Sequence, residues 1–313
     1  MKALVVILNK DNAEGLKICI ESLLNQTAKL CEDFDILVLD GFSADNSEEV
    51  VKACSSPCIR FKIQDRLGGT GYARAEACEY ALKQKYDVVI WGDSENVYFP
   101  DYVEKMLNCL KSADAAGGLP IVRGGFIAHA FAWYHAIHAI VPGLAEMHIP
   151  GNNKAERVEI FRKVKYPESK RAEDYGFSLI LRKKGIKLRQ KLTDAKVFVS
   201  LPETVGGLHR WQMARAKGAA EAAYMVEAFP VDFLIWLVPL MPVVMAFICP
   251  LISLYLFLLL FMLSTAIFVR SVRYIEKPKK IYFFAPFFGI LIHSIYTLIS
   301  LFYYLKLKYF KLS

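Results

Sequence analysis

The chain has 313 residues, is 55% hydrophobic and carries a formal net charge of +8. This length allows one sizeable catalytic domain with something smaller beside it, and a mean hydropathy of +0.29 argues against a wholly soluble protein. Aromatic residues are not interleaved with the basic ones, so nucleic acid is not an expected partner.

The N-terminal third alternates between apolar runs and segments in which apolar residues recur at helical spacing. Strands are expected over the runs 3–8, 34–39 and 87–91, and helices over 14–24 and 76–83. This alternation, with short polar turns, predicts a parallel α/β sheet. The runs are closed by Asn9, Asp40 and Asp93. Ligands bind at the carboxyl ends of the strands in such sheets, so these three side chains are expected to face one.

The N-terminal residues are not expected to be a secretory signal. Residues 1–9 carry one Lys, lack a small-residue cleavage site and run straight into polar sequence, so the N-terminal domain is expected in the cytoplasm. The seven cysteines are scattered, and Cys54 and Cys58 have no second ligand pair at zinc-finger spacing. Reduced, partly buried thiols are therefore expected rather than a metal site.

The middle of the chain changes character. Residues 126–140 hold several aromatic residues and three histidines but few charges. His135 and His138 have helical spacing and could bind a metal, but an amphipathic or interfacial helix is the more common reason for such a pattern.

A basic block follows over residues 151–191, with 13 Lys or Arg and 5 Asp or Glu. The first 50 residues, by contrast, hold 4 Lys and 10 acidic residues. A basic block ahead of a membrane segment suits an anionic headgroup, a lipid phosphate or a diphosphate. The alternative is a solvated basic helix face that only orients the protein.

The C-terminal part contains two long stretches without charge, Phe233 to Phe268 and Ile281 to Leu305. A bilayer-spanning helix needs about 20 apolar residues. We therefore expect a cytoplasmic domain over 1–228 and a membrane anchor over 229–313. The anchor is expected to contain three hydrophobic segments, at 231–249, 251–269 and 281–305.

The loop from Arg270 to Lys280 has five Lys or Arg and one acidic residue, Glu276, so it is expected on the cytoplasmic side. The first two hydrophobic segments would then form a hairpin that turns near Pro250. The last segment either crosses the membrane once or dips in and returns, and the sequence allows both.

Two acidic pairs are candidates for chemistry. Asp93-Ser-Glu95 follows an apolar strand, and two carboxylates so spaced at a strand end can hold a hard divalent cation. Glu173 and Asp174 open an expected helix inside the basic block. Taken alone, a solvated turn explains the first pair equally well, and ordinary helix capping explains the second.

These residues belong to an ordered set along the chain. The set comprises Asn9, Asp40 followed by Gly-Phe-Ser-Ala-Asp45, Gly69-Thr-Gly-Tyr-Ala-Arg74, Asp93-Ser-Glu95, Ala172-Glu-Asp174 and Gln212-x-x-Arg215. It resembles the family 2 inverting glycosyltransferases over about residues 1–218. The resemblance implies a GT-A fold, an α/β domain with a Rossmann-like and mostly parallel sheet. Interfacial helices and the C-terminal transmembrane helical region would follow it.

The resemblance also implies a donor site. Asn9 and Asp40 would line the nucleotide pocket of a UDP- or GDP-sugar, and Arg74 would lie near the base or the diphosphate. Asp93 and Glu95 match the family's D-x-D and would hold Mg2+ or Mn2+ against the diphosphate, with Asp93 also contacting the nucleotide-sugar. Glu95 departs from the pattern by one methylene group.

The acceptor side is implied in the same way. Asp174 matches the catalytic base, with Glu173 beside it. Gln212 and Arg215 match the Q-x-x-R-W motif beneath the acceptor and diphosphate. The Trp of that motif is Ala216 here, and Trp211 lies just before Gln212 as a shifted candidate for stacking.

The expected function is metal-dependent, inverting transfer of a single sugar, because about three spans are few for the processive synthases that share the motif. The acceptor is expected to be a polyprenyl or dolichyl phosphate, or a lipid-linked saccharide, in glycan or glycoprotein assembly. For a phosphate acceptor, Arg157, Arg162 and Lys163 are candidate donors of charge-assisted hydrogen bonds. A glycerolipid is the alternative acceptor, and a catalytically impaired, nucleotide-binding membrane scaffold is the alternative function.

Overall fold

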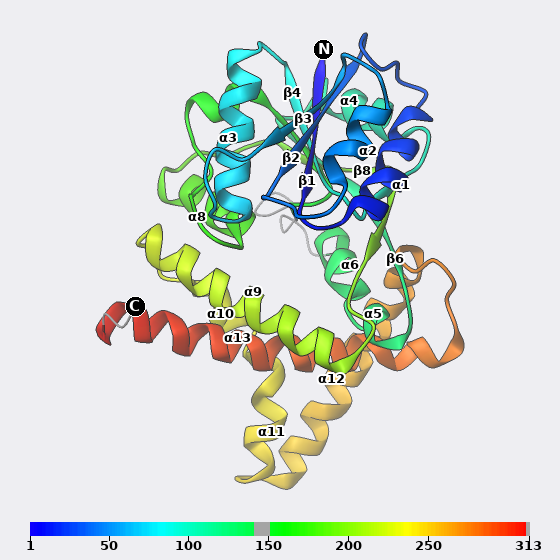
Figure 1. Ribbon diagram of the computed structural model, residues 1–313. Coiled ribbons are helices and arrows are strands. Elements are labelled where there is room, and N and C mark those ends of the chain that lie inside the picture. The colour runs from blue at the N-terminus through cyan, green and yellow to red at the C-terminus, as the bar shows by residue number, and fades with distance from the viewer. Residues whose placement is uncertain (141–150, 311–313) are drawn as a thin grey trace. The chain divides into compact units, whose positions relative to one another are not determined.

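The structure is a computed structural model that describes residues 1–140 and 151–310 (Figure 1). The chain divides into two compact units. We call residues 1–120 with 142–199 the sheet unit, and residues 121–141 with 200–313 the helical unit. The sequence suggested a boundary at residue 228, whereas in the structure the segments 121–141 and 200–228 group with the C-terminal helices.

The sheet unit is built on an eight-stranded sheet in the order β3-β2-β1-β4-β7-β6-β8-β5. Four strands are parallel, β1 (Ala3–Asn9), β2 (Phe34–Asp40), β3 (Ile59–Ile63) and β4 (Val88–Asp93). The remaining strands are β5 (Val97–Tyr98), β6 (Ala115–Arg123), β7 (Lys154–Arg157) and β8 (Gln190–Ser200), and β7 pairs antiparallel with both β4 and β6. The expected α/β fold with a mostly parallel sheet is therefore confirmed.

Helices cover both faces of this sheet, with α1 and α2 on one side and α3 and α8 on the other (Figure 1). The helices of this unit are α1 (Ala13–Leu24), α2 (Ser47–Ala53), α3 (Thr70–Lys83), α4 (Tyr102–Leu110), the 3-10 helix η1 (Val158–Arg162) and α8 (Glu173–Lys183). Every residue of β1 and β2 is buried, as expected for strands covered on both faces. One core packs Trp91 of β4 against Phe161 and Phe177, beside the alanines of α3.

A disulfide joins Cys31 to Cys58 across 27 positions of sequence. This corrects the expectation that all the cysteines are reduced. The cause is the parallel pairing of β2 with β3, in which Ile36 of β2 donates its backbone N–H to the carbonyl of Cys58, 2.8 Å away. The starts of the two strands are thus adjacent. Five cysteines of the described residues are free, Cys54 among them.

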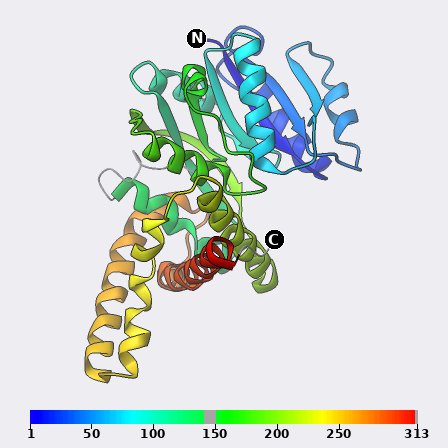
Figure 2. The same ribbon diagram turned by 90° about the vertical axis from the view of Figure 1, so that its left-hand side faces the viewer.

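The helical unit contains two short helices from the middle of the chain, α5 (Phe126–His129) and α6 (Ala132–Ile140). Its C-terminal helices are α9 (Val205–Met225), α10 (Val231–Ile235), α11 (Met241–Ala246), α12 (Pro250–Ser271) and α13 (Ala285–Phe310), with 3-10 turns at Val238–Leu240, Val272–Tyr274 and Lys280–Phe284. Within this unit, α13 lies beside α9, and α11 and α12 form a hairpin (Figure 2).

The expected hydrophobic segment 231–249 is not one continuous helix. It consists of α10, a 3-10 turn and α11, and the breaks fall where Pro239 and Pro242 begin the second and third pieces. Proline lacks the N–H that would continue the preceding helix. Two helical segments of the described chain are long and apolar enough to cross a membrane by length and composition, Pro250–Tyr274 and Lys280–Phe310.

Candidate active site

The sheet brings three of the expected site residues to one edge. Asn9 and Asp40 are direct partners in the register of β1 with β2, and Asp93 is the partner of Leu8 in the register of β1 with β4. All three residues lie at the carboxyl ends of neighbouring parallel strands, where ligands bind in sheets of this kind.

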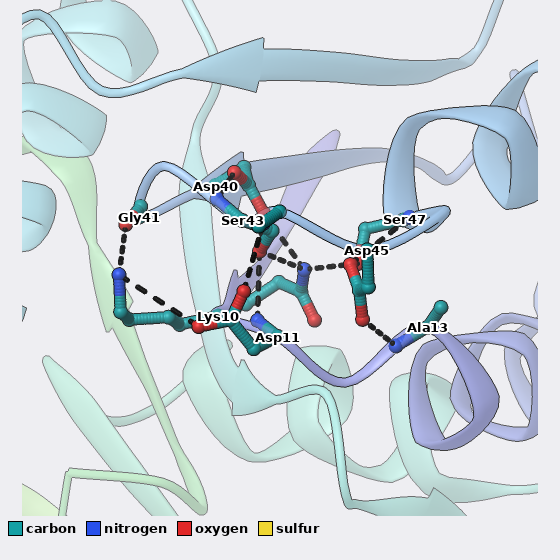
Figure 3. Close-up of polar contacts among 10 residues, drawn as sticks. Lys10, Asp11, Ala13, Asp40, Gly41, Ser43, Asp45 and Ser47 are labelled. Atoms are coloured by element: carbon teal, nitrogen blue, oxygen red, sulfur yellow. Dashed lines mark hydrogen bonds and ion pairs between the residues drawn. The ribbon is translucent and has the colours of Figure 1, made fainter.

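Asn9 and Asp40 hold the loop that follows β2. Figure 3 shows Asp40 with Ser43 and Ser47 of this loop. The Asn9 Nδ2 donates to Asp40 Oδ1 at 2.8 Å and to Ser47 Oγ at 2.9 Å. Ser43 donates to the Asp40 carboxylate twice, from its backbone N at 2.7 Å and from its Oγ at 2.6 Å. Asn9 and Asp40 are both buried. Their polar groups therefore shape the turn, and a nucleotide in this pocket would meet the loop they support.

The loops after β1 and β2 are also tied to each other. Asp11 donates its backbone N–H to Ser43 Oγ at 2.7 Å and accepts one from Ala44 at 2.8 Å. The Asp45 carboxylate accepts the backbone N–H of Ala13 at 2.7 Å, at the start of α1 (Figure 3). These bonds close one side of the strand-end site into a connected frame.

Arg74 lies inside the protein and pairs with Glu173. Its Nε donates to Glu173 Oε1 at 2.8 Å, and its Nη2 donates to the Gly151 carbonyl at 2.8 Å. Its guanidinium also lies over the Trp91 ring, 4.6 Å from the centroid. Burial lowers the pKa of Arg74, but Glu173 and nearby acidic groups that include Asp93 outweigh it and raise the pKa overall. Arg74 therefore provides positive charge close to Glu173 and Asp93.

The contact between Arg74 and Glu173 depends on the Gly69-Thr-Gly71 segment at the start of α3. Gly71 donates its N–H to the Ser169 carbonyl at 3.1 Å, and Thr70 hydrogen-bonds Glu173 through its hydroxyl. A Cβ on Gly71 would lie 2.4 Å from the Ser169 oxygen, which is too close for any side chain. Gly69 has φ of +98°, a conformation that favours glycine. The start of α3 thus packs directly on the segment that leads into α8.

Asp174 lies at the start of α8 with a fixed orientation. Its carboxylate accepts the backbone N–H of Gly151 at 2.9 Å and that of Tyr175 at 2.7 Å. Ala172, just before the helix, has φ of +56°, an uncommon conformation for a residue with a Cβ. Asp174 and Asp93 are close enough for Asp174 to raise the pKa of Asp93.

Asp93 and Glu95 are carboxylates with too little positive charge around them. Burial raises the pKa of Asp93 to about 6; Arg74 opposes this shift, while Glu173 and Asp174 add to it. Partial burial of its carboxylate and the charge of Asp93 raise the pKa of Glu95 to about 7, although the residue as a whole is exposed. Such a pair fits a hard divalent cation, which prefers oxygen ligands. No group of three or more potential metal ligands occurs within the described residues, so water and substrate would complete the coordination.

Arg157 is not brought to this site. It is the register partner of Val88, at the opposite end of β4 from Asp93. Its Nε donates to the carbonyls of Leu110 and Ala113, both at 3.1 Å, and so caps the end of α4. The expectation that Arg157 holds a phosphate beside the acidic residues does not agree with this placement.

A buried polar cluster lies beneath Arg74 and was not predicted. Glu156 pairs with Lys154 at 3.1 Å and accepts hydrogen bonds from Trp91 Nε1 at 2.8 Å and from the Tyr166 hydroxyl at 2.7 Å. Lys154 and Glu156 are two positions apart on a strand, so they face the same side of the sheet. That spacing of opposite charges was the one signal in the sequence.

In the helical unit, Trp211 and Arg215 stack on the same face of α9. The Arg215 guanidinium lies 4.6 Å from the Trp211 ring centroid and 5.5 Å from that of Tyr134. Ala216, which replaces the motif's Trp, is buried. Gln212 is also buried, and its Nε2 has no hydrogen-bond partner among the described residues. Trp211 therefore stacks against Arg215 of the motif, and its role toward an acceptor stays a prediction.

The histidine pair of the middle segment lies on α6. The His135 ring packs 6.3 Å from that of Tyr274, between centroids. The side chain of His138 lies outside the described residues, so the metal alternative for this pair rests on the sequence alone.

Together, a mostly parallel sheet with acidic residues at the strand ends and at the start of a following helix defines a GT-A glycosyltransferase. The model of the family Glycosyl transferase family 2 matches residues 3–182, more than half of the chain. The chain belongs to this family and is a glycosyltransferase, which confirms the resemblance read from the sequence.

Three known proteins are similar to this chain. A mannosyltransferase, PcManGT from Pyrobaculum calidifontis, in complex with GDP-Man and Mn2+, aligns with a TM-score of 0.60 and 15% identity over 97% of this chain and 86% of its own. The undecaprenyl-phosphate mannosyltransferase of Micrococcus luteus is 20% identical over 206 residues, 63% of this chain and 83% of the relative. S. aureus TarS 1-349 aligns more weakly, with a TM-score of 0.48 and 15% identity over 95% of this chain and 90% of its own.

Proposed function

We propose that this glycosyltransferase moves a single sugar, with inversion, from a nucleotide sugar to a polyprenyl phosphate at the cytoplasmic face of the cell membrane. GDP-mannose is the first donor to test, because the structural neighbour was solved with GDP-Man and Mn2+. The similarity to an undecaprenyl-phosphate mannosyltransferase supports the polyprenyl phosphate acceptor. UDP-sugars, lipid-linked saccharides and glycerolipids are the donors and acceptors to compare.

The observation that carries this proposal is that Asp93 and Asp174 lie near the buried Arg74–Glu173 pair, with Glu95 beside Asp93. The raised pKa values of Asp93 and Glu95 mean that their ionised forms lack compensation. Perturbed carboxylates of this kind cluster at functional sites. A divalent cation, bound together with a diphosphate, would supply the missing positive charge.

Asp93 and Glu95 would hold Mg2+ or Mn2+, which offsets the charge that develops on a departing nucleoside diphosphate. Arg74 is too deeply buried to follow a leaving group, so its part is to hold Glu173 and the segment at Gly151 in position. Asn9 and Asp40 would support the loop beneath the nucleotide.

Asp174 would orient the acceptor and, if the acceptor is a hydroxyl group, would take up its proton. Its carboxylate is aimed by two backbone N–H groups, from Gly151 and Tyr175. A hydroxyl acceptor needs a base in the transition state, a contribution of about 10²–10⁴-fold. A lipid phosphate is already anionic at neutral pH and needs the base less.

The membrane location is supported by the two long apolar helices. Basic residues follow α12 at Arg273, Lys277 and Lys279, which suits an anionic cytoplasmic surface. Trp211, Gln212 and Arg215 on α9 are the residues that we assign to the acceptor side, because they match the family motif.

The test is a transfer assay with the protein purified in detergent. Radiolabelled GDP-mannose and UDP-sugars would be incubated with undecaprenyl phosphate or with diacylglycerol, with and without Mn2+, and extracted into organic solvent. The Asp93→Ala/Glu95→Ala double variant would be compared with Glu32→Ala, which alters an exposed carboxylate of a surface ion pair.

Label that enters the lipid phase from one donor, only with metal and polyprenyl phosphate, and disappears in the double variant, supports the proposal. Transfer to diacylglycerol instead would identify a glycerolipid acceptor. Label that never enters the lipid phase would contradict the proposal. A thermal shift would separate donor binding from transfer, since a ligand at 100 times its Kd stabilises a protein by about 2.7 kcal/mol.

A further inference from the structure

The helices α9 and α13 lie side by side along much of their lengths. His209 on α9 hydrogen-bonds the Tyr296 hydroxyl on α13 at 2.7 Å, and Lys217 lies 5.2 Å from the ring centroid of Tyr303. Further along, Phe229, just beyond α9, packs on Tyr304 at 5.8 Å between ring centroids. The two helices would therefore lie at the same depth in a membrane.

Their common orientation follows from the charges of α9. This helix carries four charged residues, Arg210, Arg215, Lys217 and Glu221. If α13 crossed the bilayer, α9 would have to cross beside it and take these charges through the hydrocarbon. Charged side chains at the bilayer centre are costly and rare. The pair α9–α13 is therefore expected to lie along the membrane surface.

The outer face of α13 fits a surface position. Four large side chains recur on it every seven residues and are exposed, namely Phe288, Ile295, Phe302 and Tyr309. Residues with this spacing share one side of a helix. An amphipathic helix with such a face lies in the interface with its apolar side toward the acyl chains.

The hairpin of α11 and α12 runs roughly perpendicular to α13 within the helical unit (Figures 1 and 2). From Leu260 onward, one face of α12 is packed against α6 and α13: Leu260 and Ile267 join Trp133 and Ile290 in one core cluster, whereas Met262 and Val269 on other sides of the helix are exposed. Only Pro250–Leu259 extends beyond this level, a length of about 15 Å at 1.5 Å per residue. The hydrocarbon core of a bilayer is about 30 Å thick, so the hairpin reaches roughly its middle.

The tip of the hairpin is suited to hydrocarbon. Phe247, Ile248 and Leu251 are 89%, 70% and 80% exposed, and no charged residue lies near them. The turn is closed by hydrogen bonds from Cys249 N to the Met245 carbonyl at 2.7 Å and from Ser253 Oγ to the Pro242 carbonyl at 2.7 Å. Backbone groups paired in this way can end inside a bilayer.

We propose that the helical unit is a monotopic membrane platform, with α13 in the plane of one leaflet and the α11–α12 hairpin inserted into that leaflet without crossing. The lipid partner is the acyl layer of that leaflet. Arg270, Arg273 and Lys280, at the shared end of α12 and α13, would meet its anionic headgroups. The sheet unit, the loop after α12 and the end of α13 then all lie on one side of the membrane. This inference goes beyond the proposed function and does not depend on it.

The test uses sealed right-side-out and inside-out membrane vesicles that contain the full chain. They would be treated with a membrane-impermeant maleimide, and labelled cysteines would be located by peptide mass spectrometry. The natural Cys249 reports the hairpin tip. Separate variants Lys83→Cys, Lys277→Cys and Lys306→Cys report the sheet unit, the loop after α12 and the last turns of α13, all at exposed positions.

We expect the three engineered cysteines to be labelled in the same type of vesicle, and Cys249 to be labelled in neither until SDS is added. Phe247→Cys, at the most exposed position of the tip, should behave like Cys249, which excludes burial within the protein as the cause. Labelling of the tip from either side, or of Lys306→Cys from the side opposite Lys83→Cys, would overturn the proposal. None of these readouts uses activity, so a failed transfer assay would leave the result unaffected.

Discussion

Arg74 and Glu173 form an ion pair, 2.8 Å from Nε to Oε1, in which both side chains are almost completely shielded from solvent. The two residues are 99 positions apart and come from α3 and α8. The pair fixes the start of α8, which carries Asp174, against the helix that follows β3. The geometry of the acidic site therefore depends on a contact that lies inside the protein.

Removing one partner of this pair should destabilise the protein strongly. Glu173→Ala would leave Arg74 buried without its main counter-charge, and the expected loss in free energy of unfolding is about 3–5 kcal/mol. Urea titration followed by circular dichroism would measure it. Glu32→Ala removes an exposed ion pair with Lys29 and should change stability little. Equal, small effects of the two variants would argue against a structural role for Glu173.

Asp174→Asn should report on the acceptor. Removing a general base typically lowers kcat by about 10²–10⁴-fold. With an anionic phosphate acceptor the loss should be smaller than this range, while the melting temperature stays near that of the wild type. Steady-state kinetics with undecaprenyl phosphate would measure kcat. A loss of about 10⁴-fold would instead favour a hydroxyl acceptor.

Gly71→Ala should disturb the start of α3. The new Cβ would meet the Ser169 and Pro167 carbonyl oxygens at 2.4 and 2.5 Å, so the backbone must move. Overpacking of this kind costs about 1–3 kcal/mol. Gly125→Ala is the matched control, because a Cβ there meets nothing within 4 Å. Thermal unfolding of the two variants should differ clearly, and equal melting temperatures would contradict the packing argument.

The carboxylates at the end of β4 should make stability depend on pH when no divalent metal is present. The pKa of Asp93 is about 6 and that of Glu95 about 7 in the folded protein, above their usual values of about 3.9 and 4.3. Because these pKa values are raised in the folded protein, the two carboxyl groups contribute fully to the free energy of unfolding only below about pH 4. This contribution decreases above that pH and is lost as the pH rises through 6 and 7.

Asp93→Asn should therefore raise the melting temperature in EDTA by a few degrees at pH 8 and by about half as much at pH 5, which lies midway between the unfolded and folded pKa values. Differential scanning calorimetry at both pH values would measure the shift. The variant should lose transfer activity at either pH. An identical change in melting temperature at pH 5 and pH 8 would show that ionisation of Asp93 does not limit stability.

The Cys31–Cys58 disulfide should stabilise the sheet unit. A cross-link that closes a loop of 27 positions is expected to contribute about 3 kcal/mol through the entropy of the unfolded chain. Reduction with dithiothreitol, or Cys31→Ala, should lower the unfolding free energy by that order. Cys54→Ala, at a free thiol nearby in sequence, should not. Unchanged stability after reduction would mean that the bond is not formed in the purified protein.

The strand-end residues could be predicted because their positions follow from local patterns. An apolar run that stops at a polar residue marks a strand end, and parallel strands align such ends at one edge, which brought Asn9, Asp40 and Asp93 together. The same logic cannot say which polar atoms are used internally. Asp40, for example, accepts both of its closest hydrogen bonds from Ser43, three residues away, in a turn whose geometry only the structure reveals.

Contacts between distant segments were beyond reach of the sequence. The family resemblance predicts Arg74 near the nucleotide, but it cannot predict that its partner Glu173 comes from another helix. Arg157 looked available for a phosphate because it lies in a basic block, yet β7 runs antiparallel to β4 and carries it to the far end of the strand. Strand direction, which composition does not encode, decided that outcome.

The carboxyl pair at the end of β4 also has a consequence for how the enzyme loads its metal. Near pH 6, where Glu95 is mostly protonated and Asp93 about half so, binding of a divalent cation by both carboxylates would release about 1.4 protons. The released protons would carry away more than half of the added charge, so Arg74, Glu173 and Asp174 would experience a smaller change in local field than two full charges produce. The proton release itself would give a calorimetric signal, in buffers of different ionisation enthalpy, by which metal loading can be counted.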